Sequence, residues 1–152
     1  MLVRLVLFLV FNFGALAIGG IYTASGVTSD WYNQLNKAPW TPPGWVFGAS
    51  WTLIMVCLAV YMAYLYNEPS HQKVALLLYG VQLVLNVVWN PLFFRNHSTA
   101  LALVVIVLLT CVVIGLFTLY FQTLGLKSFL IMPYVVWLLI ATSLNAYIVI
   151  RN

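Results

Sequence analysis

The segment LALVVIVLLTCVVIGLFTLYF, residues 101–121, decides the fold. It carries no charged side chain and is about as long as the 20 apolar residues that a helix needs to cross a bilayer. A strand of a membrane barrel would alternate apolar and polar residues, and the run 101–109 does not alternate. The segment is therefore predicted to be a transmembrane α-helix.

Four more apolar stretches flank this one, and three of the four connections are short. Of the 152 residues, 64% are hydrophobic and 5% are charged, whereas soluble domains carry roughly a quarter charged residues. We therefore predict an all-α integral membrane protein, a single five-helix transmembrane domain over residues 1–152. The predicted helices are 2–22, 45–66, 72–94, 99–121 and 127–150.

The first stretch also has the outline of a signal peptide. Arg4 would form its charged region, and Ala15-Leu16-Ala17 would be the cleavage site. Its apolar length is sufficient to span the bilayer, and we predict a transmembrane helix instead.

The charged residues give a net charge of +4 and are scattered singly along the chain. No basic run suggests a nucleic-acid partner, and single cations next to apolar spans are typical of anchors at the bilayer surface. Lysines and arginines divide equally between the two faces, so neither the orientation nor the particular membrane can be predicted. The cations are Arg4, Lys37, Lys73, Arg95, Lys127 and Arg151.

Metal and catalytic motifs are absent from the sequence. Cys57 and Cys111 lie in apolar stretches without metal-ligand spacing, and His71 and His97 are single loop residues. No carboxylate lies inside a span, which disfavours a proton-coupled exchanger. We expect no metal and no required cofactor.

One connection, between residues 22 and 45, is long. Its part 30–45 is rich in aromatic residues and contains Pro39, Pro42 and Pro43. Prolines reduce the entropy of the unfolded segment, which favours a folded loop. We predict a structured lid on one end of the bundle, and the alternative is a belt of aromatic residues at the bilayer surface.

Polar residues interrupt the third stretch with helical spacing. Gln82, Asn86 and Asn90 share one face, and in a membrane such side chains either bond to other helices or line a cavity. In the first stretch, Ala15 and Gly19 permit close helix approach within the bundle or across a dimer.

Two prolines are predicted to break helices locally. Pro91 ends the third stretch, and Pro133 removes a backbone donor in the fifth. A kink at Pro133 would turn Tyr134 and Trp137 toward the bundle interior.

Several blocks of the chain resemble the translocator protein/tryptophan-rich sensory protein (TspO/MBR) family, which includes the peripheral-type benzodiazepine receptor. They occur in the order found in that family and are spread over nearly the whole chain. The blocks are Trp31-Tyr32, Leu35-Asn36-Lys37, the run 39–48, Trp51, the run 82–94, the run 133–137 and Leu144-Asn145.

The resemblance implies a five-helix homodimer in which the first loop closes a ligand pocket inside the bundle. Family members bind porphyrins such as protoporphyrin IX, sterols and synthetic benzodiazepine ligands. Some are described as degrading porphyrin in light. Trp51 and Trp137 match pocket tryptophans of the family and are the candidate catalytic residues if this chain is such an enzyme. Leu101 replaces a tryptophan of animal members, so part of their drug site is altered.

A porphyrin needs flat apolar walls and a cation or amide at the rim for its carboxylates. Lys37 and Arg95 are the candidate rim cations, with contact to phospholipid headgroups as the alternative. The candidate ligand-binding residues, from chemistry and resemblance together, are Trp31, Trp40, Trp51, Asn86, Trp89, Tyr134, Trp137, Ala141 and Leu144.

The last stretch satisfies a loose sterol-binding pattern through Leu144, Tyr147 and Arg151. An interfacial tyrosine and an arginine at a helix end explain the same pattern. The match to animal members is also shifted, because Ala146 occupies the position of their usual tyrosine.

Three functions fit these residues: a receptor for tetrapyrroles or other apolar ligands, a light- and oxygen-dependent porphyrin-degrading enzyme, and a transporter of porphyrins or sterol-like lipids. We predict the receptor, linked to tetrapyrrole or stress regulation. Its expected partners are a porphyrin or sterol-like ligand and the lipid bilayer.

Overall fold

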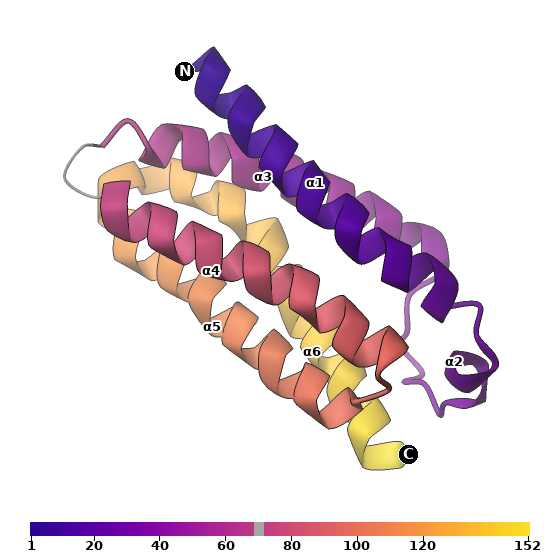
Figure 1. Cartoon of the computed structure of the whole chain (residues 1–152). Coiled ribbons are helices and arrows are strands. Elements are labelled where there is room, and N and C mark those ends of the chain that lie inside the picture. The colour runs from indigo at the N-terminus through magenta and orange to yellow at the C-terminus, as the bar shows by residue number, and fades with distance from the viewer. Residues whose placement is uncertain (69–71) are drawn as a thin grey trace.

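A computed structural model describes residues 1–68 and 72–152, and Figure 1 shows its helices side by side in one bundle. His71 and part of the predicted link 67–71 lie outside the described residues. The elements are α1 (Leu2–Gly26), α2 (Asp30–Gln34), α3 (Gly44–Leu65), α4 (Gln72–Asn90), η2 (Pro91–Arg95), α5 (Thr99–Leu124), η3 (Gly125–Ile131) and α6 (Met132–Arg151).

Within the described residues, four uninterrupted helical stretches are long and apolar enough to cross a membrane. The last, Thr99–Arg151, reverses near Gly125, whose φ is +54°, and so contains both α5 and α6. The predicted all-α membrane architecture is confirmed, and the chain has five long helices. An odd number of passes places the termini at opposite ends of the bundle, as Figure 1 shows.

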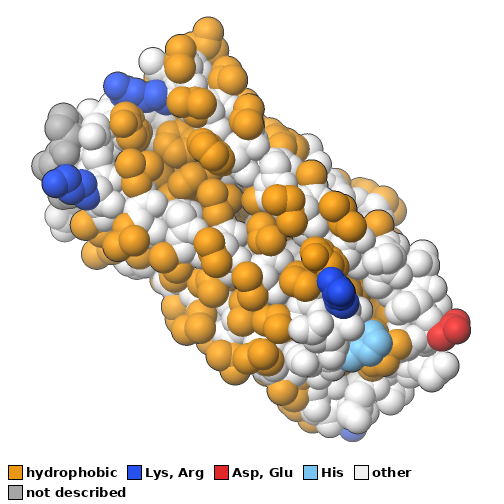
Figure 2. All heavy atoms as spheres, in the orientation of Figure 1, with side chains coloured by type: hydrophobic (Ala, Val, Ile, Leu, Met, Phe, Trp, Pro, Cys, Tyr) orange, Lys and Arg blue, Asp and Glu red, His pale blue; other side chains and the backbone are white. Residues whose placement is uncertain are grey.

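The outer surface of the bundle is apolar. Val10, Val84 and Leu119 are each more than 60% exposed, and Figure 2 shows apolar side chains covering the flank, with Lys and Arg toward its two ends. Such a surface suits contact with lipid chains, because hydrocarbon requires no polar coat. The core is also apolar, and the buried residues of α3, such as Met55 and Leu58, are central to it.

Polar side chains inside the bundle join helices to one another. Asn12 of α1 donates to the carbonyl of Met55 at 2.9 Å, and the Tyr79 hydroxyl of α4 donates to Asn12 Oδ1 at 2.7 Å. Tyr61 of α3 donates to the carbonyl of Leu116 in α5 at 2.7 Å. Buried polar groups in a membrane need such partners, so these bonds fix the relative positions of four helices.

Two glycines bring α1 against the end of α4 and η2. A Cβ on Gly19 would lie 2.6 Å from Asn90 Nδ2, and one on Gly26 would overlap the ring of Phe94. The close approach predicted at Gly19 therefore occurs within the bundle. Ala15, one turn earlier, is half-buried.

The predicted break at Pro133 is a change of helix type at the start of α6, not a kink inside a regular helix, and Tyr134 and Trp137 are buried as predicted. Residues 125–131 form the 3-10 helix η3, and Pro133 lies in the first turn of α6. A first-turn proline loses no helical hydrogen bond, because the first backbone N–H groups of a helix have no partner within it. Pro91 similarly begins the π-helical turn η2 at the end of α4.

The long first connection folds over one end of the bundle, next to the C-terminus (Figure 1). It begins with the short helix α2, where the Ser29 hydroxyl accepts a hydrogen bond from the Tyr32 backbone N–H at 3.2 Å. This is the capping bond that favours a helix start. We refer to residues 27–43 as the lid.

Candidate functional site

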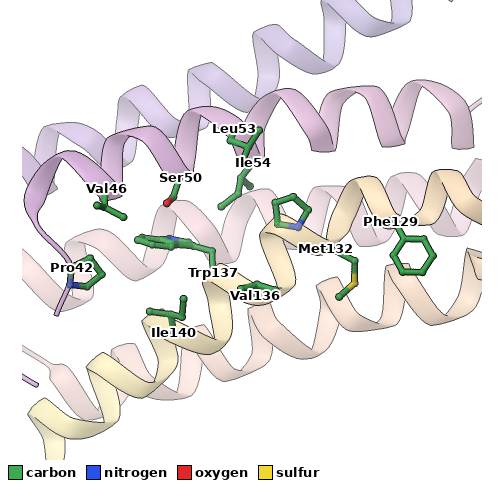
Figure 3. A pocket seen from close by; sticks show the side chains of 11 residues that line it. Pro42, Val46, Ser50, Leu53, Ile54, Phe129, Met132, Val136, Trp137 and Ile140 are labelled. Atoms are coloured by element: carbon green, nitrogen blue, oxygen red, sulfur yellow. The ribbon is translucent and has the colours of Figure 1, made fainter. Parts of the chain in front are cut away.

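An apolar groove runs between α3 on one side and η3 and α6 on the other (Figure 3). Its volume is about 600 Å³. Leu53, Phe129 and Val136 on its wall are about half exposed, so the groove opens on the flank of the bundle, toward lipid. It is lined by Pro42, Val46, Ser50, Leu53, Ile54, Phe129, Met132, Pro133, Val136, Trp137 and Ile140.

Trp137 is the one tryptophan on the wall of this groove. Figure 3 shows its indole reaching from α6 to the space beside Val46 and Ser50 of α3. The ring is 5% exposed and packs edge-on against Phe47, with centroids 5.2 Å apart. The groove therefore has a fixed, flat aromatic side chain in a wall that is apolar apart from Ser50.

Trp51 is half-buried and is not among the residues that line the groove. Its ring packs edge-on against Tyr134 with centroids 5.9 Å apart, and the Tyr134 hydroxyl donates to Gln82 Oε1 at 3.0 Å. The Nε2 atom of Gln82 is buried and has no hydrogen-bond partner among the described residues. Trp51 and Tyr134 thus form a second aromatic pair, which does not line the groove.

A separate group of aromatic residues lies beneath the lid at the end of α4. The Trp89 indole stacks on Phe93 at 5.1 Å and donates from Nε1 to Asn145 Oδ1 at 3.1 Å. Asn86 is buried one turn before Asn90, whose Oδ1 accepts from Thr23 at 2.7 Å. Gln82 and Asn90 therefore form hydrogen bonds to other helices, which is one of the two roles predicted for them; the other was lining a cavity.

The lid residues Trp31 and Trp40 contact the bundle at two points. Trp31 stacks on His97 with ring centroids 4.0 Å apart. Trp40 packs edge-on against Tyr147 at 5.4 Å, and its indole donates to Ser143 Oγ at 3.1 Å. These contacts confirm a folded lid.

A pair of asparagines adds a third attachment of the lid. The backbone N–H of Asn36 donates to Asn152 Oδ1 at 2.9 Å, and Asn152 Nδ2 donates to the Asn36 carbonyl at 3.4 Å. The end of α6 is therefore hydrogen-bonded to the segment that precedes the groove residue Pro42.

Neither predicted rim cation lines the groove. Lys37 lies over the ring of Tyr32 at 4.7 Å, and burial raises the pKa of the Tyr32 hydroxyl. Arg95 borders a second cavity, between η2 and the end of α1, together with Tyr22 and Ser25 of α1.

The sterol-type pattern is partly covered by the lid. Leu144 is buried, and the Tyr147 ring lies between Trp40 and the Arg151 guanidinium, whose carbon is 5.7 Å from the ring centroid. Ala141 is half-buried and packs against the core. The lid therefore packs on this part of α6, through the ring of Tyr147 and the backbone carbonyl of Arg151.

Several groove residues were not predicted as ligand contacts. Phe129 and Met132 precede Pro133, and only the proline signalled that the chain changes conformation there. Pro42 was predicted only as part of the lid. Nothing in the sequence pairs these positions with Val46 and Ser50, because helix periodicity does not reveal which helices are neighbours.

Among the described residues, no group of three His, Cys, Asp or Glu side chains could hold a metal ion. Cys57 and Cys111 are free thiols.

A five-pass helical bundle with a lateral apolar groove and a hydrogen-bonded lid defines a small multi-pass membrane protein. The chain belongs to the TspO/MBR family, whose family model matches residues 6–151.

Named relatives occur in bacteria and animals. The chain is 31% identical over 144 residues to Protein CrtK of Rhodobacter capsulatus, covering 93% of this chain and 89% of that one. It is 38% identical to the tryptophan-rich sensory protein of Cereibacter sphaeroides, over 76% of this chain and 73% of that one. It is 32% identical to the human translocator protein, over 76% of this chain and 70% of that one.

Proposed function

We propose that this protein is a membrane receptor that binds porphyrin-type tetrapyrroles and other flat apolar ligands in the groove between α3 and α6. The observation that carries this proposal is the groove itself, about 600 Å³ in volume with Trp137 on its wall. Pockets for small ligands fall in the range of roughly 300–1,000 Å³ and are mostly apolar.

The lining suits a flat aromatic ligand. The Trp137 indole offers a π-surface for stacking or edge contact, and such aromatic contacts contribute about 0.5–1.5 kcal/mol beyond burial of area. Ile140, Val136 and Met132 extend the apolar wall along α6 and the end of η3. Ser50 supplies the polar side chain of the opposite wall.

A sensory role is supported by the attachment of the lid near the groove. Pro42 belongs both to the lid and to the groove wall, and the lid is hydrogen-bonded to α6 through Trp40 and Asn36. A ligand beside Pro42 would therefore move the lid. The lid lies at the end of the bundle, so this movement would change an exposed surface of the protein. The name of the Cereibacter relative, a tryptophan-rich sensory protein, agrees with this reading.

The test is a titration of the purified protein in detergent with protoporphyrin IX in the dark, following tryptophan fluorescence. Saturable quenching near one ligand per chain is expected, with weaker binding in Trp137→Phe. Trp45→Phe is the matched control, because Trp45 is 75% exposed and outside the groove. Equal affinities in all three proteins would exclude a porphyrin site at Trp137.

Light-driven degradation is the second candidate. It is favoured by the position of Trp137 on the groove wall and by the ring contact between Trp51 and Tyr134, because closely spaced aromatic residues could exchange electrons with an excited ring. Illumination of the same porphyrin complex distinguishes the receptor from the enzyme. Loss of porphyrin absorbance that disappears in Trp137→Phe and Trp51→Phe would establish the enzyme, and dark binding without such loss supports the receptor.

A further inference from the structure

A second cavity, of about 390 Å³, lies at the lid end of the bundle, between the end of α1 and η2. It is separate from the groove, with which it shares no lining residue. Its lining includes hydroxyl groups and a cation as well as apolar side chains. The residues are Ile21, Tyr22, Ser25, Gly26, Ser29, Phe94 and Arg95.

The local backbone explains why Arg95 is placed here. Gly26 has no Cβ, so α1 lies directly against the ring of Phe94. Phe94 and Arg95 both belong to the π-helical turn η2, in which Phe94 is buried and Arg95 is exposed. The turn thus buries the aromatic ring against α1 and leaves the guanidinium at the mouth of the cavity.

Two polar groups of the cavity have no partner among the described residues. The Arg95 guanidinium forms no ion pair, hydrogen bond or ring contact there, and the Tyr22 hydroxyl forms no hydrogen bond. By contrast, the cations Arg4, Lys37, Lys127 and Arg151 each lie over a tyrosine ring. An unpaired arginine beside an unpaired phenol offers several donors to an anion.

The two serines supply further hydroxyl groups. Ser25 Oγ donates to the backbone carbonyls of Ile21 and Tyr22 at 3.1 and 3.2 Å, and rotation of the hydroxyl would redirect this donor into the cavity. Ser29 Oγ is already engaged, since it donates to the Gly26 carbonyl at 2.6 Å and accepts from Tyr32. Tyr22, Ser25 and Arg95 are therefore the available donors.

The apolar surface next to the cavity is suited to acyl chains. Ile18 and Ile21 of α1 are 51% and 69% exposed, and Val84 and Val88 of α4 are also exposed. These two helices pack against each other in the bundle. A lipid whose headgroup lies at Arg95 could extend its chains toward the bilayer centre along this surface.

We propose that Tyr22, Ser25 and Arg95 bind the phosphate of an anionic glycerophospholipid whose chains lie along α1 and α4. A guanidinium matches a phosphate through two parallel hydrogen bonds. No carboxylate lines the cavity, so it offers no counter-ion for the ammonium of a zwitterionic headgroup. The net charge of +4 adds a general preference for anionic lipid.

The test is native mass spectrometry of the protein after release from detergent micelles that contain either phosphatidylglycerol or phosphatidylcholine. We expect retained phosphatidylglycerol to exceed phosphatidylcholine. Arg95→Gln should weaken retention of phosphatidylglycerol roughly tenfold, because the charge-assisted hydrogen bonds from the guanidinium to the phosphate are lost. Tyr22→Phe should weaken it by a smaller factor.

Arg151→Gln is the control, because it removes one positive charge at the same end of the bundle and lines neither cavity. Equal loss in Arg151→Gln and Arg95→Gln would overturn the proposal in favour of general charge attraction. Displacement of the lipid by inorganic phosphate alone would overturn it in favour of a soluble anion.

The same variants distinguish this site from the porphyrin site. Arg95→Gln is expected to leave quenching by protoporphyrin IX unchanged. Loss of porphyrin affinity with unchanged lipid retention would assign Arg95 to the porphyrin carboxylates, the role predicted from sequence, and would overturn the lipid site.

Discussion

The Trp40 indole in the lid donates a hydrogen bond to Ser143 Oγ, 3.1 Å away in the last transmembrane helix. The two residues are 103 positions apart in the chain. Because the same indole also packs against Tyr147, a single side chain attaches the lid to α6 by both a polar and an apolar contact.

Ser143→Ala should loosen the lid without unfolding the bundle. It removes one hydrogen bond, worth about 1 kcal/mol, which corresponds to roughly a fivefold increase in lid opening. Trp40→Ala should have a larger effect, because the contact with Tyr147 is also lost. Hydrogen exchange of residues 30–40 measures both, and Trp45→Ala should leave exchange unchanged.

Ser50→Phe should fill the groove. The new ring would occupy space beside Trp137 and lower the affinity for protoporphyrin IX by about tenfold, the effect of losing roughly 1.4 kcal/mol. Ala49→Phe, one position along α3, is exposed and outside the groove, and should bind porphyrin normally. Equal affinities of the two variants would exclude the groove as the site.

Tyr134 and Gln82 should show energetic coupling. Tyr134→Phe leaves the Gln82 amide without its bonded partner and should cost about 1–3 kcal/mol of stability. Gln82→Met combined with Tyr134→Phe should cost less than the sum of the single changes. Thermal unfolding in detergent tests this cycle, with a coupling near 0.6 kcal/mol expected inside a membrane protein. Strict additivity would mean that the bond contributes nothing.

Gly26→Ala should destabilise the bundle, whereas Gly20→Ala should not. The added methyl group at Gly26 meets the Phe94 ring, and overpacking of this kind costs about 1–3 kcal/mol. A Cβ on Gly20 has no neighbour within 4 Å, and alanine favours the helix by up to about 1 kcal/mol. The midpoint of thermal unfolding should fall in the first variant and stay or rise in the second.

Much of the fold could be predicted from the sequence because a bilayer imposes a minimum length of apolar helix. The helix ends were less predictable. α1 continues past Tyr22 to Gly26, since the Thr23 and Ser25 hydroxyls bond to carbonyls four residues earlier and do not interrupt it. The start of α6 at Met132 was not predicted, because the preceding 3-10 helix has no strong signal in the sequence.

The candidate site was less predictable than the fold. Tryptophans marked the lid as a candidate binding region, but the sequence does not show that Trp137 lines a groove while Trp51 packs against Tyr134 outside it. That difference depends on contacts between helices distant in the chain. The position of Arg95 likewise depends on the turn at η2, which the sequence indicated only through Pro91.

The sideways opening of the groove, past Leu53, Phe129 and Val136, determines how a ligand would arrive. A hydrophobic molecule would first partition into the hydrocarbon and then reach the protein by diffusion in two dimensions. Occupancy would follow the mole fraction of ligand in the membrane and not its aqueous concentration. An apparent dissociation constant expressed in bulk units would therefore increase in proportion to the amount of lipid in the assay, while the intrinsic affinity stayed the same.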